Sequence, residues 1–118
     1  MGALMERRKI IACDFDGTLY TDDYPDVGEP IWKTINYCKE QKENGAILIL
    51  WTCRMGDDLT EAVELCRSVG LTFDYINENA KESMWGYARD SRKIYADEYI
   101  DDKAINVNDL PSEKFYGF

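Results

Sequence analysis

The sequence predicts an α/β domain built around a mainly parallel sheet. Three observations predict this class: short apolar runs alternate with longer amphipathic segments, the runs have the length of buried strands, and turn residues separate them. The chain of 118 residues is 45% hydrophobic and 31% charged, the composition of an ordinary globular protein with one core. We therefore expect a single domain spanning residues 1–118, with about five strands.

Five segments have the pattern of strands. The two most apolar are IIAC, within residues 8–13, and AILILW at residues 46–51. Both are continuous apolar runs, as expected of strands buried on two faces. The other three segments are shorter or mix polar with apolar residues. The predicted strands are residues 8–13, 46–51, 71–76, 96–100 and 104–107.

The first predicted helix spans residues 29–44. Pro30 suits a first helical turn, and Asn44-Gly45 is typical of a helix end. Between this helix and the first strand, residues 19–28 contain turn formers and have no period. They predict a loop or short flap.

Two more helices are predicted further along the chain. Asp58 and Glu61 form a capping-box pattern at the start of the second helix, which ends at Gly70. A short third helix is predicted from residue 79 to about residue 90. Since helices then lie between successive strands, the sheet should be mainly parallel.

The charge balance excludes several functions. The chain has a formal charge of −9 and contains no histidine. An acidic surface repels nucleic acid backbones, so duplex DNA or RNA is a disfavoured partner. The lack of histidine excludes Ser-His and Cys-His nucleophile systems and histidine metal sites. Acid–base catalysis would have to use carboxylates, Lys, Tyr or Cys.

The sequence also predicts a cytoplasmic protein. Its longest apolar run is far shorter than the roughly 20 residues of a membrane span, and its first residues lack a secretory signal pattern. The four cysteines are Cys13, Cys38, Cys53 and Cys66, and none of them forms a CxxC pair. We expect reduced thiols, most of them used as small apolar side chains.

Polar side chains follow several of the predicted strands. Asp14 and Asp16 follow the first strand, Thr52 the second, and Asp101 and Asp102 the fourth. Because ligands bind at the carboxyl ends of parallel strands, we expect these groups to share one cleft. Like charges that close repel each other unless a cation lies between them or one is protonated. Carboxylate oxygens at this density suit a hard divalent cation, most simply Mg²⁺.

The same residues suit phosphoryl transfer. A bound Mg²⁺ would leave positions open for a phosphate oxygen, and Thr52 and the loop amides could hold the other oxygens. Lys93 would offset negative charge, and Asp16 could act as general acid and base. Arg54 follows Thr52 closely enough to touch a substrate. Phosphoryl transfer depends mostly on positioning and charge neutralisation, which these groups would supply.

Four segments resemble the motifs of the haloacid dehalogenase-like superfamily of phosphatases and phosphotransferases. DFDGTL at residues 14–19 matches its first motif, D-x-D-G-[TV]-[LIV]. The hydrophobic strand ending in Thr52 matches the second motif, Lys93 looks like the third, and YIDD at residues 99–102 resembles the fourth. All four occur in the order of the superfamily.

The resemblance implies a role for each matching residue. Asp14 would be the nucleophile that forms an aspartyl-phosphate. Asp16 would protonate the leaving group and then activate water, while its backbone carbonyl binds Mg²⁺. Thr52 and Lys93 would complete the catalytic set, with Lys103 and Lys81 as fallback candidates for the cation. The expected phosphate-binding residues are Gly17, Thr52, Cys53, Arg54 and Lys93, and the expected metal ligands are Asp14, Asp16, Asp101 and Asp102.

The resemblance also implies a three-layer Rossmann-like core without a cap domain. Between Ile76 and Ala96 the chain has room for one helix and no inserted domain. Capless members tend to act on large or macromolecular substrates, or to use a neighbouring subunit as a lid. The resemblance therefore implies either a large phosphorylated substrate or a homo-oligomer whose neighbouring subunit covers the site.

The expected activity is Mg²⁺-dependent hydrolysis of phosphate monoesters, and several alternatives stay open. Within the superfamily these are a phosphotransferase, a nucleotidase or a polynucleotide-end phosphatase. Outside it, a receiver-like phospho-aspartate switch or a non-catalytic binding module is less well supported. A receiver would carry its phosphorylated Asp after the third strand, where this chain has Ile76-Asn77. The physiological substrate stays open.

Overall fold

A four-stranded parallel sheet forms the centre of the protein. The computed structural model describes residues 7–85 and 89–111. The strand order is β5-β4-β1-β6, and every neighbouring pair is parallel. The strands are β1 (Ile10–Cys13), β4 (Ile47–Leu50), β5 (Tyr75–Ile76) and β6 (Glu98–Ile100). The predicted α/β class with a mainly parallel sheet is confirmed, with four strands in the described residues rather than about five.

The predicted fifth strand is wrong. Residues 104–107 are exposed and unpaired, and Val107–Asp109 forms the 3₁₀ helix η2. The side chain of Asn106 accepts a hydrogen bond from the backbone nitrogen of Asn108 at 2.8 Å. Local side-chain bonding of this kind competes with strand pairing, which explains the difference.

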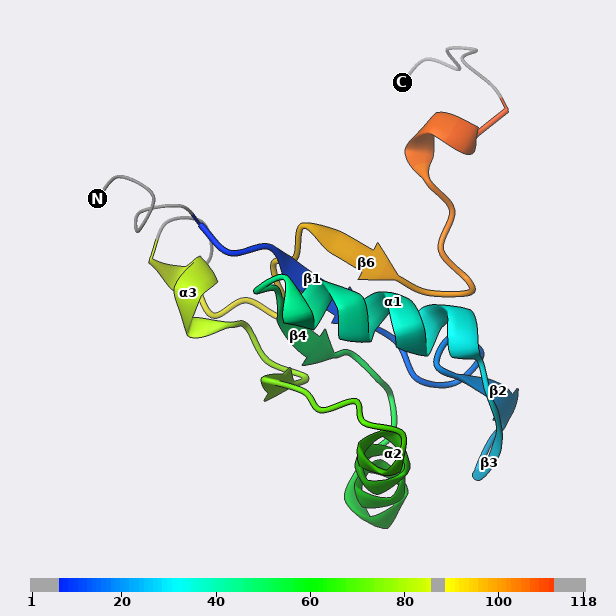
Figure 1. Cartoon of the computed structure of the whole chain (residues 1–118). Coiled ribbons are helices and arrows are strands. Elements are labelled where there is room, and N and C mark those ends of the chain that lie inside the picture. Colours follow the sequence, from blue (N-terminus) through cyan, green and yellow to red (C-terminus); the bar gives the residue numbers. More distant parts are fainter. Residues whose placement is uncertain (1–6, 86–88, 112–118) are drawn as a thin grey trace.

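The predicted loop or flap at residues 19–28 is a β-hairpin. Strand β2 (Tyr20–Asp23) pairs antiparallel with β3 (Asp26–Pro30), with Tyr20 opposite Pro30. Because Pro30 belongs to β3, the first helix starts two residues after it rather than at Glu29. In Figure 1 the hairpin lies on the side toward which the arrows of β4 and β6 point.

Two helices cover one face of the sheet. They are α1 (Trp32–Glu43) and α2 (Gly56–Ser68). Alternate residues of β1 and β4 point toward them, and both helices present small or branched apolar side chains in return. This buried cluster contains Ile11, Cys13, Leu48 and Leu50 from the strands and Ile35, Cys38, Ala62 and Cys66 from the helices.

The opposite face of the sheet is also covered. There Ile10 and Ala12 of β1 pack with Ala80, just before the short helix α3 (Lys81–Met84), and with Ile94 and Ala96. Both faces of the sheet are therefore covered at its centre, which is why β1 and β4 are apolar and buried at every position.

The order of the strands determines where a ligand site can form. From β1 the chain passes through α1 to β4 and through α2 to β5, always toward the same edge. It then returns to add β6 on the other side of β1. Crevices at such a reversal, beyond the carboxyl ends of the strands, are the usual ligand sites of open parallel sheets.

The described residues contain no helix that is both long and apolar enough to cross a membrane.

Candidate active site

A tight turn follows β1 and carries the first two aspartates. The carbonyl oxygen of Phe15 accepts hydrogen bonds from the backbone nitrogens of Leu19 at 2.9 Å and Tyr20 at 3.2 Å. Gly17 adopts φ +79°, and its N–H donates to the carbonyl of Tyr20 at 2.7 Å. Because Phe15 and Leu19 are fully buried, the turn is anchored to the core while its acidic residues remain at the edge of the sheet.

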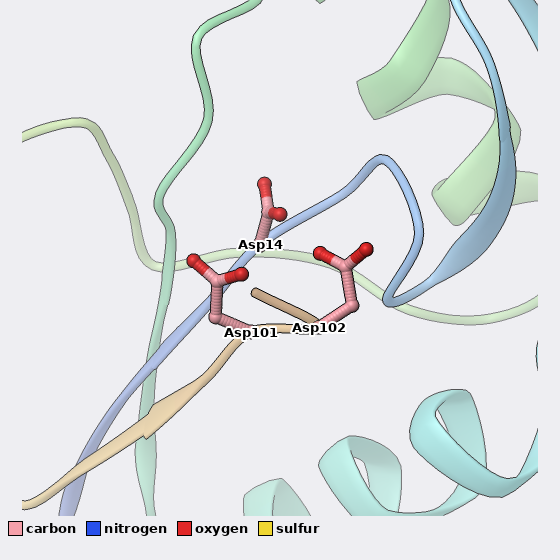
Figure 2. A group of neighbouring side chains, drawn as sticks. All are labelled: Asp14, Asp101 and Asp102. Atoms are coloured by element: carbon pink, nitrogen blue, oxygen red, sulfur yellow. The ribbon is translucent and has the colours of Figure 1, made fainter. Parts of the chain in front are cut away.

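Three carboxylates converge where β1 and β6 end. Each of Asp14, Asp101 and Asp102 offers an oxygen atom, and these three atoms all lie within 4.8 Å of one another. Figure 2 shows their oxygens around a common space. The two chain segments are joined there, since the backbone nitrogen of Asp14 donates to the carbonyl of Ile100 at 2.9 Å. A group with only oxygen ligands, such as this one, could hold a hard divalent cation.

Two residues of the turn after β1 hold Asp102 in place. The hydroxyl oxygen of Thr18, which is buried, accepts a hydrogen bond from the backbone nitrogen of Asp102 at 3.1 Å. The carboxylate of Asp102 packs against the backbone of Gly17, where a Cβ atom would lie 2.7 Å from the Asp102 Cγ. Glycine is thus required at position 17 both for its positive φ and for this close approach.

Burial, together with neighbouring acids, raises the pKa of Asp14 to about 6. Desolvation of the half-buried carboxyl is the main cause, and repulsion from Asp101, Asp102 and Asp16 adds to it. A hydrogen bond from the backbone nitrogen of Phe15 to Asp14 Oδ1, at 2.8 Å, acts in the opposite direction. A bound cation would offset this repulsion and favour the charged form of Asp14.

Thr52 lies on the other side of Asp14, just beyond the end of β4. The backbone nitrogen of Trp51 donates to the carbonyl of Cys13 at 2.9 Å, which extends the pairing of β4 with β1. The Thr52 hydroxyl oxygen accepts a hydrogen bond from the backbone nitrogen of Arg54 at 3.1 Å, so its own O–H remains able to donate to an anion.

Asn77 supports Thr52 and was not among the predicted site residues. Its side-chain oxygen accepts a hydrogen bond from the backbone nitrogen of Thr52 at 2.8 Å. Asn77 has φ +54° and directly follows β5. The rule that identified the other strand-end residues could have found it, because it too follows a predicted strand.

These groups border a cavity of about 750 Å³. Most of its wall comes from the segments that follow β1, β4 and β6, and the hairpin adds one side. The lining residues are Asp14, Asp16, Asp22, Tyr24, Trp51, Thr52, Cys53, Arg54, Asn77, Asp101 and Lys103. The structure therefore brings most of the predicted site residues together around one space.

Arg54 is buried rather than exposed to a substrate. Its guanidinium forms an ion pair with Asp16, at 2.8 Å between Nη2 and Oδ1. The hydrogen bonds to Asp16 raise the pKa of Arg54 above its ordinary value. Its predicted contact with substrate phosphate is not what this arrangement favours, because the guanidinium already has protein partners.

Lys93 is exposed and does not line the cavity. It precedes β6, whereas the cavity lies beyond the end of that strand. Of the two fallback cations, Lys103 does line the cavity, and its Nζ lies 3.6 Å from Asp102 Oδ2 and 3.9 Å from Asp22 Oδ2. Lys81 starts α3 and is not in the wall.

Removing the charge of Asp14 should stabilise the cation-free protein. Since the folded carboxyl has a raised pKa, wild-type stability should fall as the pH rises from the unfolded value of about 4 to about 6, and stay lower above that. Above pH 7 in chelator, Asp14→Asn should raise the free energy of unfolding on the order of 1 kcal/mol, because solvent screens the half-exposed group. Urea unfolding measures this, with exposed Asp109→Asn as control. A less stable Asp14→Asn would contradict the electrostatic account.

Gly17→Ala should damage the cluster beyond its cost in backbone strain. Gly45 has φ +96° with open space around its Cα, so Gly45→Ala carries similar strain without a contact. Both variants should lose about 1 kcal/mol or more of stability. Only Gly17→Ala should also weaken Mg²⁺ binding, by about tenfold, because it displaces Asp102. Calorimetric titration of both variants measures the difference, and equal Mg²⁺ affinities would show that Asp102 does not need this contact.

Comparison with known proteins identifies one relative. No protein-family model matches the chain, and neither does any curated protein. A solved structure of a conserved protein from Bacteroides thetaiotaomicron is 40% identical in sequence, with a TM-score of 0.71. The match covers 89% of this chain and 83% of that one. The chain therefore belongs to the same family as this conserved Bacteroides protein.

Proposed function

We propose that this protein is a Mg²⁺-dependent phosphatase that hydrolyses phosphate monoesters through an aspartyl-phosphate on Asp14. The observation that carries the proposal is the convergence of Asp14, Asp101 and Asp102 beside Thr52, at the reversal of strand order. The resemblance of the same residues to haloacid dehalogenase-like motifs supports it. A divalent cation and a hydroxyl on either side of a carboxylate suit phosphoryl transfer.

The donor set fits Mg²⁺. Asp14, Asp101 and Asp102 offer only carboxylate oxygens, and two of the three residues are exposed enough to leave room for water ligands. When bound, Mg²⁺ would neutralise charge on a phosphoryl oxygen. Asp16 turns its carboxylate to Arg54, so any contribution from Asp16 to binding the cation would come from its backbone carbonyl.

In the proposed first step, Asp14 attacks the phosphorus atom. The Phe15 N–H holds Asp14 Oδ1, which fixes the plane of the carboxylate and leaves the other oxygen as the nucleophile. An oxygen–phosphorus bond forms as the bond to the leaving group breaks, and Asp16 gives the departing oxygen its proton. The Thr52 hydroxyl would donate to a phosphoryl oxygen.

In the proposed second step, water cleaves the aspartyl-phosphate. Asp16 accepts a proton from the attacking water, and inorganic phosphate leaves with Asp14 regenerated. Lys103, which lines the cavity, is the cation that the geometry favours for balancing charge at Asp14. Lys93 keeps that role only through its resemblance to the third motif.

Activity should depend on Asp14 and on a divalent cation. We expect hydrolysis of p-nitrophenyl phosphate in Mg²⁺, its loss in chelator, and its recovery on adding Mg²⁺. Asp14→Asn should lower kcat by at least about a thousandfold, because the nucleophile is lost. Lys103→Met should lower activity more than Lys93→Met.

A screen of sugar phosphates, nucleotides, phosphopeptides and 3′-phosphorylated oligonucleotides would then identify the substrate class. The same assay should include alcohols as acceptors, since transfer to them would indicate a phosphotransferase. Turnover without a divalent cation, or turnover that survives Asp14→Asn, would contradict the proposed function.

A further inference from the structure

We infer that Arg54 is a positioning residue that fixes the Asp16 carboxylate and the β2–β3 hairpin as one rigid unit beside Asp14. This role rests on the proposed phosphatase function, in which Asp16 transfers protons. It differs from the substrate contact that the sequence predicts for Arg54. Three features support it: the geometry of the pair, its connection to the hairpin, and its separation from the carboxylate cluster.

The Arg54–Asp16 pair is bidentate and buried. Arg54 Nε donates to Asp16 Oδ2 at 2.9 Å, and Nη2 donates to Oδ1 at 2.8 Å. The side chain of Arg54 is 0% exposed, and that of Asp16 is 20% exposed. Two parallel charge-assisted hydrogen bonds prevent the carboxylate from rotating, and their geometry requires a guanidinium. The unused lone pairs of Asp16 remain able to exchange a proton on the cavity side.

The same guanidinium fixes the turn of the hairpin. Nη1 donates to the carbonyl of Pro25 at 3.1 Å, and Nη2 donates to the carbonyl of Asp26 at 2.7 Å. The Cζ atom lies 5.0 Å from the ring centre of Phe15 and 5.2 Å from that of Tyr24. Most N–H donors of Arg54 are therefore used within the protein, and both rings contact its charge.

This pairing separates Asp16 from the other acids. Although Asp14 and Asp16 are only two residues apart, the group of converging carboxylates contains Asp14, Asp101 and Asp102 but not Asp16. Arg54 compensates the charge of Asp16 and leaves the cluster for a cation. The carboxylate that transfers protons is thus held at a defined place beside the nucleophile, where an error of about 1 Å would lower the rate markedly.

The pair also determines one wall of the cavity. Asp22 and Tyr24 of the hairpin line the same cavity as Thr52. Since the hairpin carbonyls accept from Arg54, loss of the guanidinium should loosen the hairpin at its turn.

The test compares leaving groups. Phenyl phosphate and p-nitrophenyl phosphate have similar shapes, but phenolate is more basic than p-nitrophenolate. Departure of phenolate therefore depends more strongly on protonation by a general acid. For Arg54→Lys and Arg54→Met, kcat/KM for phenyl phosphate should fall at least about tenfold more than for p-nitrophenyl phosphate. Asp16→Asn should show the same selectivity. Arg67→Met, on the exposed face of α2, is the matched control and should change neither value.

A double variant tests whether Arg54 acts through Asp16. In the Asp16→Asn background, Arg54→Lys should leave the ratio of the two kcat/KM values unchanged. If Arg54 had a merely structural role, Arg54→Lys would instead lower kcat/KM for both substrates equally, and its effect would add to that of Asp16→Asn. Either of those results would overturn the inference.

Hydrogen exchange provides a test that requires neither enzyme activity nor a substitution at Arg54. The amide of Glu29 donates to Thr21 Oγ1 at 2.8 Å and reports closure of the hairpin. This amide should exchange faster in Asp16→Asn, because Arg54 loses its charged partner. Unchanged exchange would overturn the coupling of Asp16 to the hairpin, even if both Arg54 variants failed to fold.

Failure of this inference can be distinguished from failure of the proposed function. If wild-type turnover survives Asp14→Asn, the phosphatase mechanism is wrong. If Asp14→Asn abolishes turnover while the Arg54 variants lower kcat/KM equally for both substrates, only the positioning role is wrong.

Discussion

Mutual repulsion among Asp14, Asp101 and Asp102 is the constraint on which the site depends. The strand order brings these carboxylates together, because β1 and β6 are parallel neighbours that end at the same edge. The protein does not relieve the repulsion with its own side chains alone: burial and neighbouring acids raise the pKa of Asp14. This repulsion lowers the free energy of unfolding of the cation-free protein, and a bound cation would offset it. The close packing of Asp102 against Gly17 holds one of the three carboxylates in this cluster.

Arg54 keeps a fourth carboxylate, that of Asp16, out of the converging group and compensates its charge. Its bidentate pair with Asp16 joins the end of β4 to the turn after β1 and to the hairpin, so these segments share one buried charge pair. The two parallel hydrogen bonds of this pair orient the carboxylate, whereas the burial of such a pair is weak evidence for added stability. In the proposed mechanism, geometry is what matters, since Asp16 must meet both the leaving group and the attacking water. The structure thus separates two charge environments within one short turn.

The sequence predicted the class of the fold and most of the cavity wall, but not the contacts that organise it. Asp14, Thr52 and Asp101 could be found because each follows an apolar strand, and parallel strands end at a common edge. The hairpin was missed because its pairing, with Tyr20 opposite Pro30, is not visible as a period in residues 19–28. The burial of Arg54 depends on carbonyls of that hairpin, so it could not be predicted before the hairpin was known. Lys93 lies before β6, where the strand-end rule does not apply.

The most direct test of the central claim is to trap the phosphorylated enzyme during turnover. Acid quenching of the protein with a substrate and Mg²⁺, borohydride reduction, and peptide mass spectrometry would locate the acyl-phosphate, because borohydride converts a phosphorylated aspartate to homoserine. The account predicts homoserine at position 14 in the wild type, and none without substrate. Turnover with no modification at Asp14, or with a modification at another residue, would contradict it.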